Sequence, residues 1–395
     1  MRIDFGFVVA SLLFLGDIFW FNGLKLSQLG MVLLVFLIYK RNTIISKRVV
    51  SVALFVFVYN LLLNLFNIDQ MLNSIIKFSL LIIILMCAFD IKRLTYGRLL
   101  SYYFSFSSFV VIIWWIQLVA FLISSFSPFN LEIIYDSSSW SDSGNLHWVG
   151  NFPRLNSLYS EPSYLGLFLL PLLAIKLRNA PPFRWLTVLI PIMMTFSLNV
   201  YIGLGLTILF NSNLSLKTVV LVVIGTFMTL MLGLDEYILH RTDVNSGYID
   251  VTLLVYIFHI QTFLFEWKNI LFGYGIDNYF LIFDSWRSSF VSSEILTIVK
   301  TIPDEELMLQ GAPLLIVRLL VELGYAFFLI VGFAIRKYIF VKSYWIYALV
   351  GLSLRDGDYL RPFFLFFLIM HISNSIIRQK QINYERNNSV RTVQS

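Results

Sequence analysis

The stretch from Arg154 to Gly166 carries an arginine and, seven residues later, a glutamate that opens an apolar segment. A guanidinium fork binds phosphate oxygens through parallel hydrogen bonds and stays protonated, and a carboxylate can take a proton from a hydroxyl. Arg154 and Glu161 therefore suit the transfer of a group from a phosphate-linked donor to a hydroxyl. Two plainer interpretations stay open. Arg154 is then an ordinary loop arginine, and Glu161 complements a helix dipole between the cap Ser160 and the first-turn Pro162.

A second pair of charged residues lies inside an apolar stretch nearer the C-terminus. Arg318 comes five residues after Pro313, and Glu322 follows four positions later. Residues four apart share one face of a helix, and ionisable side chains at membrane depth are costly and usually functional. Arg318 is therefore a candidate for phosphate binding and Glu322 a candidate base. The alternative is a structural ion pair.

A third group of charged residues, Arg355, Asp356, Asp358 and Arg361, lies just before the last apolar stretch. The two arginines could clamp a phosphate, and Asp358 could serve an acceptor hydroxyl as a base. A solvated turn is the alternative. Two carboxylates without further ligands predict no metal site, and the single cysteine, Cys87, excludes an internal disulfide and a cysteine-built metal site.

These charged groups stand out because the rest of the chain is apolar. Of its 395 residues, 58% are hydrophobic and 13% are charged, and the mean hydropathy is +0.79. Soluble domains have about 25% charged residues, and a bilayer core of about 30 Å requires about 20 apolar residues per helix. We therefore predict an all-α, polytopic transmembrane helical bundle. Its membrane helices, about 12 in number, are expected at 5–21, 26–39, 49–66, 71–89, 99–126, 163–176, 185–198, 199–210, 218–234, 313–335, 343–354 and 362–377.

Basic residues in short loops orient such a bundle, because they stay on the cytoplasmic side. With the N-terminus inside, most of the 29 basic residues fall in the inside segments 40–48, 90–98, 176–184, 211–217 and 336–342 and in the C-terminal tail. The net charge of +6 therefore follows from topology and does not indicate a nucleic-acid partner. Both termini are predicted to be cytoplasmic. The expected regions are N-terminal helices (1–126), a first outer loop (127–160), central helices (161–234), a second outer loop (235–312), C-terminal helices (313–377) and a cytoplasmic tail (378–395).

The apolar run 185–210 is long for one crossing and short for two. As a single helix it would measure about 39 Å at a rise of 1.5 Å per residue. A single crossing would also place the basic segment 336–342 outside. We therefore predict two short helices with a break around Ser197, Leu198 and Asn199. Non-helical backbone at that depth needs protein or a water-filled cavity to cover it.

Five stretches, in this order, resemble those of Wzy-type polysaccharide polymerases, the membrane enzymes that polymerise O-antigen or capsule repeat units. The sequence RLNSLYSEPSYLGLFLLP at 154–171 resembles their arginine-to-EPS segment, and MTFSLNVYIG at 194–203 resembles their paired short helices. The sequence KNILFGYGIDNY at 268–279 resembles the glycine element of their large outer loop. The sequence LLVELGYAFFLIVGF at 319–333 resembles a helix that follows this loop. The last, LRDGDYLRPFFLFFL at 354–368, resembles the charged turn before their final helix.

The resemblance implies a fold like that of C-type glycosyltransferases, in the bacterial inner (plasma) membrane. It implies transfer of a growing glycan from polyprenyl diphosphate to a hydroxyl of an incoming lipid-linked repeat unit on the outer face. The partners would be this lipid-linked oligosaccharide, membrane lipid and a polysaccharide chain-length regulator, and no cofactor is expected. The diphosphate would be bound by Arg154, Arg318, Arg355 and Arg361. The candidate catalytic carboxylates are Glu161, Asp358 and Glu322.

Two alternative functions use the same donor. An O-antigen ligase would move the glycan to lipid A core. Such ligases typically have a His-Asn pair shortly before the ELG helix, where this chain has Gln310-Gly311-Ala312-Pro313. A flippase or exporter would need a cationic cavity across the bilayer, but the embedded cations are only Lys77 and Arg318. Both comparisons favour the polymerase.

Overall fold

The computed structural model describes most of the predicted helices. The described residues are 5–15, 20–21, 24–39, 47–64, 75, 79, 82–83, 86, 88–89, 91, 93–124, 148–149, 152–153, 155, 157–159, 162–179, 181–195, 197–210, 271–275, 279, 314–339, 343–355 and 362–394. The predicted span 218–234, most of the predicted span 71–89 and most of the two outer loops lie outside them. So do four of the seven candidate site residues, Arg154, Glu161, Asp358 and Arg361.

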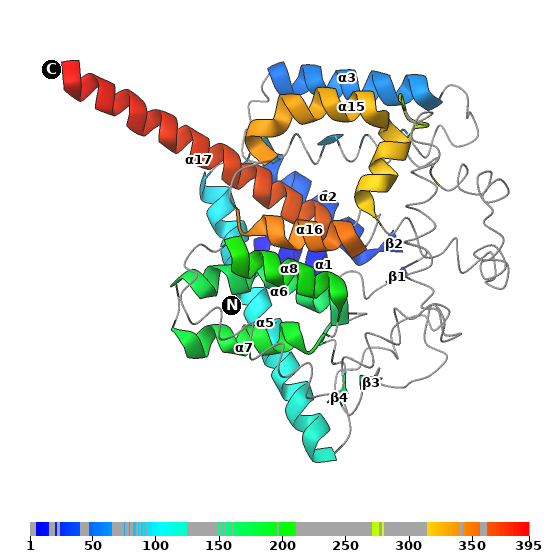
Figure 1. Ribbon diagram of the computed structural model, residues 1–395, viewed down its shortest axis with the longest axis vertical. Helices are drawn as coiled ribbons and strands as arrows, with labels where there is room; N and C mark the ends of the chain where they lie inside the picture. Colours follow the sequence, from blue (N-terminus) through cyan, green and yellow to red (C-terminus); the bar gives the residue numbers. More distant parts are fainter. Residues whose placement is uncertain are drawn as a thin grey trace.

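The described chain is helical, which confirms the all-α prediction. In chain order, its helices are α1 (Phe5–Leu15), α2 (Leu26–Tyr39), α3 (Lys47–Asn64), α5 (Arg93–Ser124), α6 (Pro162–Asn179), α7 (Pro182–Met193), α8 (Leu198–Phe210), α15 (Leu315–Ile339), α16 (Trp345–Arg355) and α17 (Pro362–Gln394) (Figure 1). Two small antiparallel hairpins accompany them. Strand β1 (Trp20–Phe21) pairs with β2 (Leu24–Lys25), and β3 (Trp148–Val149) pairs with β4 (Phe152–Pro153).

Several helix boundaries differ from the predicted ones. The predicted helix 26–39 is found as α2, and the run 185–210 forms two short helices, α7 and α8, as predicted. The break lies at residues 194–197, slightly before the predicted position. Helix α1 ends at Leu15, short of the predicted 5–21. Helix α17 continues to Gln394 through the predicted tail and projects away from the other helices (Figure 1).

A cluster of buried aromatic side chains joins α1, α5, α6, α16 and α17 around Tyr103. Its ring makes edge contacts with Phe168 and Trp345, at centroid distances of 5.2 and 4.9 Å. Its hydroxyl donates to the carbonyl of Phe168 (2.6 Å) and accepts from the amide of Leu172 (3.2 Å). Pro171, which has no amide hydrogen to donate, lies between these two groups in α6. Tyr103 therefore supplies hydrogen bonds to α6 beside its proline.

Three glycines let α6, α8 and α16 approach one another closely. A Cβ atom on Gly166 would lie 2.6 Å from Val200, one on Gly203 would lie 2.5 Å from Leu170, and one on Gly351 would lie 2.3 Å from Leu167. Small residues serve the same purpose in membrane helix interfaces, where they allow close backbone approach. The packing of these three helices therefore depends on these glycines.

Replacement of Gly203 by leucine is expected to destabilise the protein by about 1–3 kcal/mol through overpacking. Leu170 would have to move, and the carbonyl oxygen of Tyr347, 3.4 Å from a Cβ atom at this position, leaves little room for the rest of the side chain. The unfolding midpoint of the purified protein measures the effect. Gly205 is the matched control, because it lies on the same helix with no atom within 4 Å of its Cβ position. Equal midpoints for G203L and G205L would contradict this packing.

Several described helices expose apolar side chains on the face opposite their buried one. On α5 these recur every three or four residues, at Phe109, Ile112, Ile116, Val119 and Ile123. On α2 they are Leu29, Val32 and Phe36. Among the described residues, the segment Arg93–Ile123 of α5 is long and apolar enough to cross a membrane, whereas the apolar segments Arg184–Met193, Asn199–Ile208 and Trp345–Leu354 are shorter. A helix with apolar side chains on all of its faces is typical of an apolar environment, such as a protein core or a membrane.

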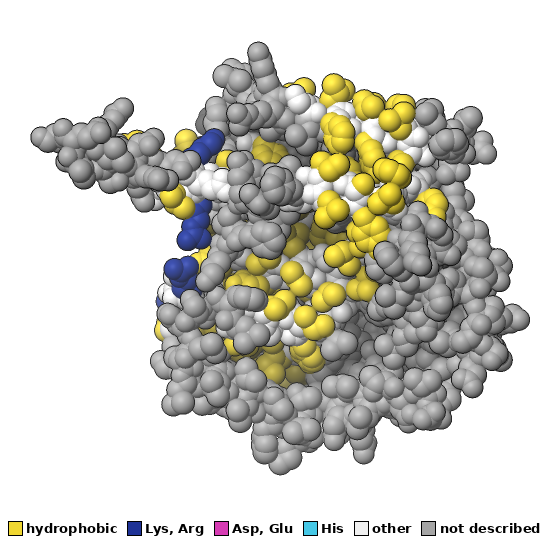
Figure 2. Space-filling view, turned by 45° about the horizontal axis from the view of Figure 1, so that its top comes forward, with side chains coloured by type: hydrophobic (Ala, Val, Ile, Leu, Met, Phe, Trp, Pro, Cys, Tyr) yellow, Lys and Arg dark blue, Asp and Glu magenta, His cyan; other side chains and the backbone are white. Residues whose placement is uncertain are grey.

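Lysine and arginine side chains are visible at one edge of the face shown in Figure 2. They form a column beside the projecting C-terminal segment, apart from the exposed apolar side chains. In the described part of the chain, exposed or half-exposed basic side chains occur at the start of α5, the end of α6, the start of α7 and the middle of α17, and include Arg93, Arg98, Lys176, Arg178, Arg184 and Arg378. All of these residues come from segments that the sequence assigns to the cytoplasmic side.

Candidate functional site

Helix α15 holds a buried ion pair directly before a break in the helix. The Arg318 Nε atom donates to Glu322 Oε1 at 2.9 Å, and the two side chains are 9% and 0% exposed. The two residues that the sequence placed on one face of a helix thus form an ion pair, the contact given as the alternative interpretation of this pair. Two residues further on, Gly324 leaves helical geometry with φ 77° and ψ 165°. The two halves of α15 consequently run in clearly different directions (Figure 1).

Segment 271–275, with the sequence LFGYG, lies against this break. The amide of Tyr274 donates to the carbonyl of Val321 (3.0 Å), and the amide of Gly275 donates to the carbonyl of Glu322 (2.8 Å). Two stretches that the sequence analysis treated as separate motifs, in the second outer loop and in the following helix, thus meet through their backbones. Glu322 is fixed on both sides, its carboxylate by Arg318 and its carbonyl by Gly275.

The loop between Arg154 and Glu161 is anchored to α5 by one side chain. Gln117, which is fully buried, donates from Nε2 to the carbonyl of Ser157 (3.2 Å) and accepts the Ser157 amide at Oε1 (2.9 Å). The Ser157 hydroxyl donates to the carbonyl of Val110 (3.0 Å), and its φ of 54° makes a tight local turn. The backbone between the two predicted residues is therefore held at a defined place on α5, although Arg154 and Glu161 themselves lie outside the described residues.

Replacement of Gln117 by leucine is expected to cost about 1–3 kcal/mol of stability for each backbone group of Ser157 left buried without its partner. A lower unfolding midpoint would show this. Ser107→Ala is the matched control on the same helix, because the buried Ser107 hydroxyl donates to a carbonyl of α5 itself, four residues before it, at 2.7 Å. We expect little change there. A midpoint for Q117L as high as that of S107A would contradict the anchoring role.

The third predicted group lies at the junction of two helices that pack on α15. Arg355 is the last residue of α16, and α17 begins at Pro362. Asp358 and Arg361 lie between them, outside the described residues. Because α15 contacts both α16 and α17, the elements that carry this group and the Arg318–Glu322 pair are neighbours.

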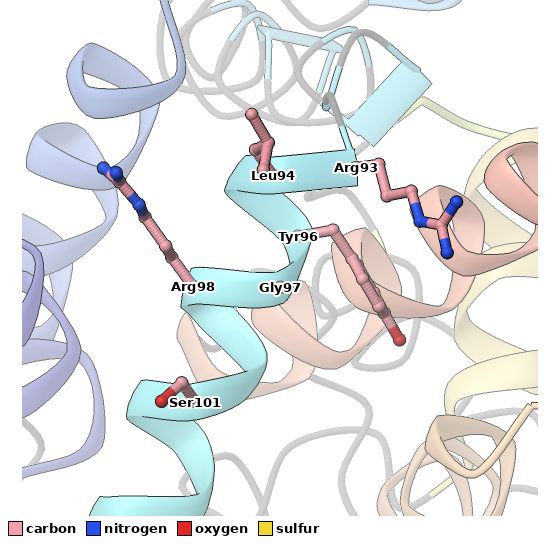
Figure 3. A pocket seen from close by; sticks show the side chains of 6 residues that line it. All are labelled: Arg93, Leu94, Tyr96, Gly97, Arg98 and Ser101. Atoms are coloured by element: carbon pink, nitrogen blue, oxygen red, sulfur yellow. The ribbon is translucent and has the colours of Figure 1, made fainter.

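A surface hollow at the beginning of α5 is unrelated to these groups. Arg93, Leu94, Tyr96, Gly97, Arg98 and Ser101 line it, all from one helix, and Arg93 and Arg98 point to opposite sides (Figure 3). It belongs to the basic edge of the molecule. No group of three or more His, Cys, Asp or Glu residues that could hold a metal ion occurs within the described ranges.

Comparison of the chain with models of known protein families, with curated proteins and with solved structures gives no match. The interpretation of the site therefore starts from its own residues and contacts. Sequence reasoning found the Arg318–Glu322 pair but missed Gln117 and the contact between segment 271–275 and α15. A glycine two positions after a buried glutamate was the available signal for the break.

Proposed function

We propose that this protein is a polysaccharide polymerase of the Wzy type in the bacterial inner (plasma) membrane. It would transfer a growing glycan from its polyprenyl diphosphate carrier to a hydroxyl of an incoming lipid-linked repeat unit. The reaction would take place on the outer face of the membrane, where the second outer loop meets the C-terminal helices. A chain-length regulator would be a partner.

The observation that carries this proposal is the buried Arg318–Glu322 pair at the break of α15. A buried arginine is costly unless it is paired, and this one is held by a carboxylate at its Nε atom, which fixes the plane of the guanidinium. The pair lies where a glycine-rich outer-loop segment crosses the helix. Both stretches are among those that resemble the polymerases, and their direct contact supports a common site.

The chemistry assigns a role to each kind of residue. The acceptor oxygen forms a new bond to the anomeric carbon, while the bond from that carbon to the diphosphate oxygen breaks. The lipid diphosphate leaves with an additional negative charge, which Arg154, Arg318, Arg355 and Arg361 would stabilise. The hydroxyl proton passes to a carboxylate, for which Glu161 and Asp358 are the candidates. Glu322 would then orient Arg318.

The arrangement of side chains supports a multi-span bundle of about 12 helices, each near the length that a bilayer requires. Apolar side chains face outward on α2, α3 and α5, where lipid would cover them. The basic side chains visible in Figure 2 lie at one edge of that face, as cytoplasmic loops do under the positive-inside rule. The first half of α15 lies on the side of the molecule away from the projecting C-terminal end of α17 (Figure 1), which would place the ion pair towards the outer face.

The glycan pattern of a deletion strain tests the function. Separated by gel according to chain length, a surface glycan reduced to one repeat unit on its final acceptor supports the polymerase. Loss of all attached glycan, with long chains still on the lipid carrier, would identify an O-antigen ligase. Unpolymerised units retained inside the cell would identify a flippase, and the site assignments would then fall.

A further inference from the structure

Two glycines from distant parts of the chain touch back to back at the break in α15. A Cβ atom on Gly324 would lie 2.3 Å from the carbonyl carbon of Phe272, and one on Gly273 would lie 2.5 Å from the amide nitrogen of Gly324. All of these neighbours are backbone atoms, so neither position has room for a side chain. Both glycines also have a φ of 77°, which L-residues rarely adopt. The crossing therefore requires a glycine both in segment 271–275 and at the break in α15.

The crossing segment supplies the hydrogen bonds that the break removes from α15. Helix ends leave carbonyls and amides without partners in their own helix. The amides of Tyr274 and Gly275 cap carbonyls at the end of the first half, and the carbonyl of Leu271 accepts from the amide of Ala326 (3.0 Å) at the start of the second half. Both half-helices are thus capped by the same five residues. Inside a membrane, water cannot bond to the free amides and carbonyls of a broken helix, so these groups need partners within the protein.

One side chain, Tyr59 of α3, joins the two partners of this crossing. Its single hydroxyl hydrogen is shared between two carbonyl acceptors, that of Phe272 in the crossing segment and that of Leu323 in the helix (3.0 Å). Its ring stacks on Phe327 in the second half of α15, with centroids 5.5 Å apart. Tyr59 therefore contacts the crossing segment and both halves of the broken helix.

We propose that Tyr59 and segment 271–275 are positioning elements that hold α15 broken at Gly324 and thereby fix Glu322 and Arg318. The three successive carbonyls of residues 321–323 all bond to groups outside α15. A shift of this clamp would rotate the end of the first half-helix, which carries the ion pair. The functional part of this inference rests on the proposed polymerase activity. The structural part does not.

The test compares Tyr59→Phe, which keeps the stacked ring and removes the hydroxyl, with Gly332→Ala. Gly332 lies in the same helix with no atom within 4 Å of its Cβ position, so it is the matched control. Gly324→Ala is a harsher variant, because backbone atoms leave no room for its side chain, and it serves only as an addition. Two quantities are measured on folded protein: amide hydrogen exchange at residues 274, 275 and 326, and polymerisation of synthetic lipid-diphosphate repeat units.

In Y59F we expect exchange at these amides to rise about fivefold, the factor of one lost hydrogen bond. We expect kcat to fall about tenfold to a hundredfold with KM nearly unchanged, as for a misplaced reacting group. Exchange equal to that of wild type and G332A would overturn the clamp. Faster exchange with an unchanged kcat and pH profile would overturn the positioning role. A wild-type protein without polymerisation would reject the proposed function, while the exchange data would still decide the clamp.

Discussion

Replacement of Glu322 by leucine is expected to destabilise the protein by about 3–5 kcal/mol, because the buried guanidinium of Arg318 would lose the carboxylate that it contacts. The pair is almost fully shielded from solvent, and its Nε–Oε1 distance is 2.9 Å. Arg318→Met alone should have a similar cost, since it removes the guanidinium that the buried carboxylate accepts from. The measurement is the unfolding midpoint of each purified variant relative to wild type.

The double variant R318M/E322L separates structure from chemistry. Replacing both members of a buried ion pair by apolar residues is often neutral or stabilising by about 1–4 kcal/mol, so the unfolding midpoint should return to that of wild type or above it. If the pair acts on the substrate, the double variant stays inactive although it is folded. Full polymerisation by the double variant would show that the pair is structural, which was the alternative interpretation at the sequence level.

Hydropathy predicted the elements whose boundaries depend on local sequence. Helix α2 and the division of residues 185–210 into α7 and α8 follow from the length of apolar runs and from polar residues at the break. The continuation of α17 to Gln394 was not predicted, because hydropathy marks where an apolar segment ends and gives no sign of where a helix ends. The break at Gly324 was missed for a different reason. Its partners, Phe272 and Tyr59, are distant in sequence.

Some contacts of the candidate site could likewise be predicted from the sequence, and others could not. The contact between Arg318 and Glu322 was predictable because spacing of four residues on a helix determines it. The anchoring of Ser157 by Gln117 was not, because a polar residue in an apolar helix gives no indication of its partner 40 positions away. The turn 355–361 was predicted from charge alone. Helices α16 and α17, which flank this turn in the sequence, both contact α15, which carries the ion pair.

Alanine substitution of each of the four arginines is expected to lower the rate of polymerisation strongly. The acceptor that the enzyme uses should stay the same. A hydrogen bond to a charged group contributes about 1.5–3 kcal/mol, so each lost arginine should reduce kcat/KM by roughly tenfold to a hundredfold. The variants are Arg154→Ala, Arg318→Ala, Arg355→Ala and Arg361→Ala. In vitro extension of lipid-diphosphate repeat units measures the effect per molecule of folded protein.

Lysine at the same positions distinguishes the contribution of charge from that of geometry. Lysine keeps the positive charge but lacks the planar fork that binds two phosphate oxygens at once, so Arg→Lys variants should regain only part of the activity. Arg98→Ala is the control, because this exposed arginine lies on α5 at the basic edge of the molecule. Activity that survives in all four alanine variants would contradict a diphosphate site built from these residues. Equal losses in the control would show that net charge, and not the site, determines the rate.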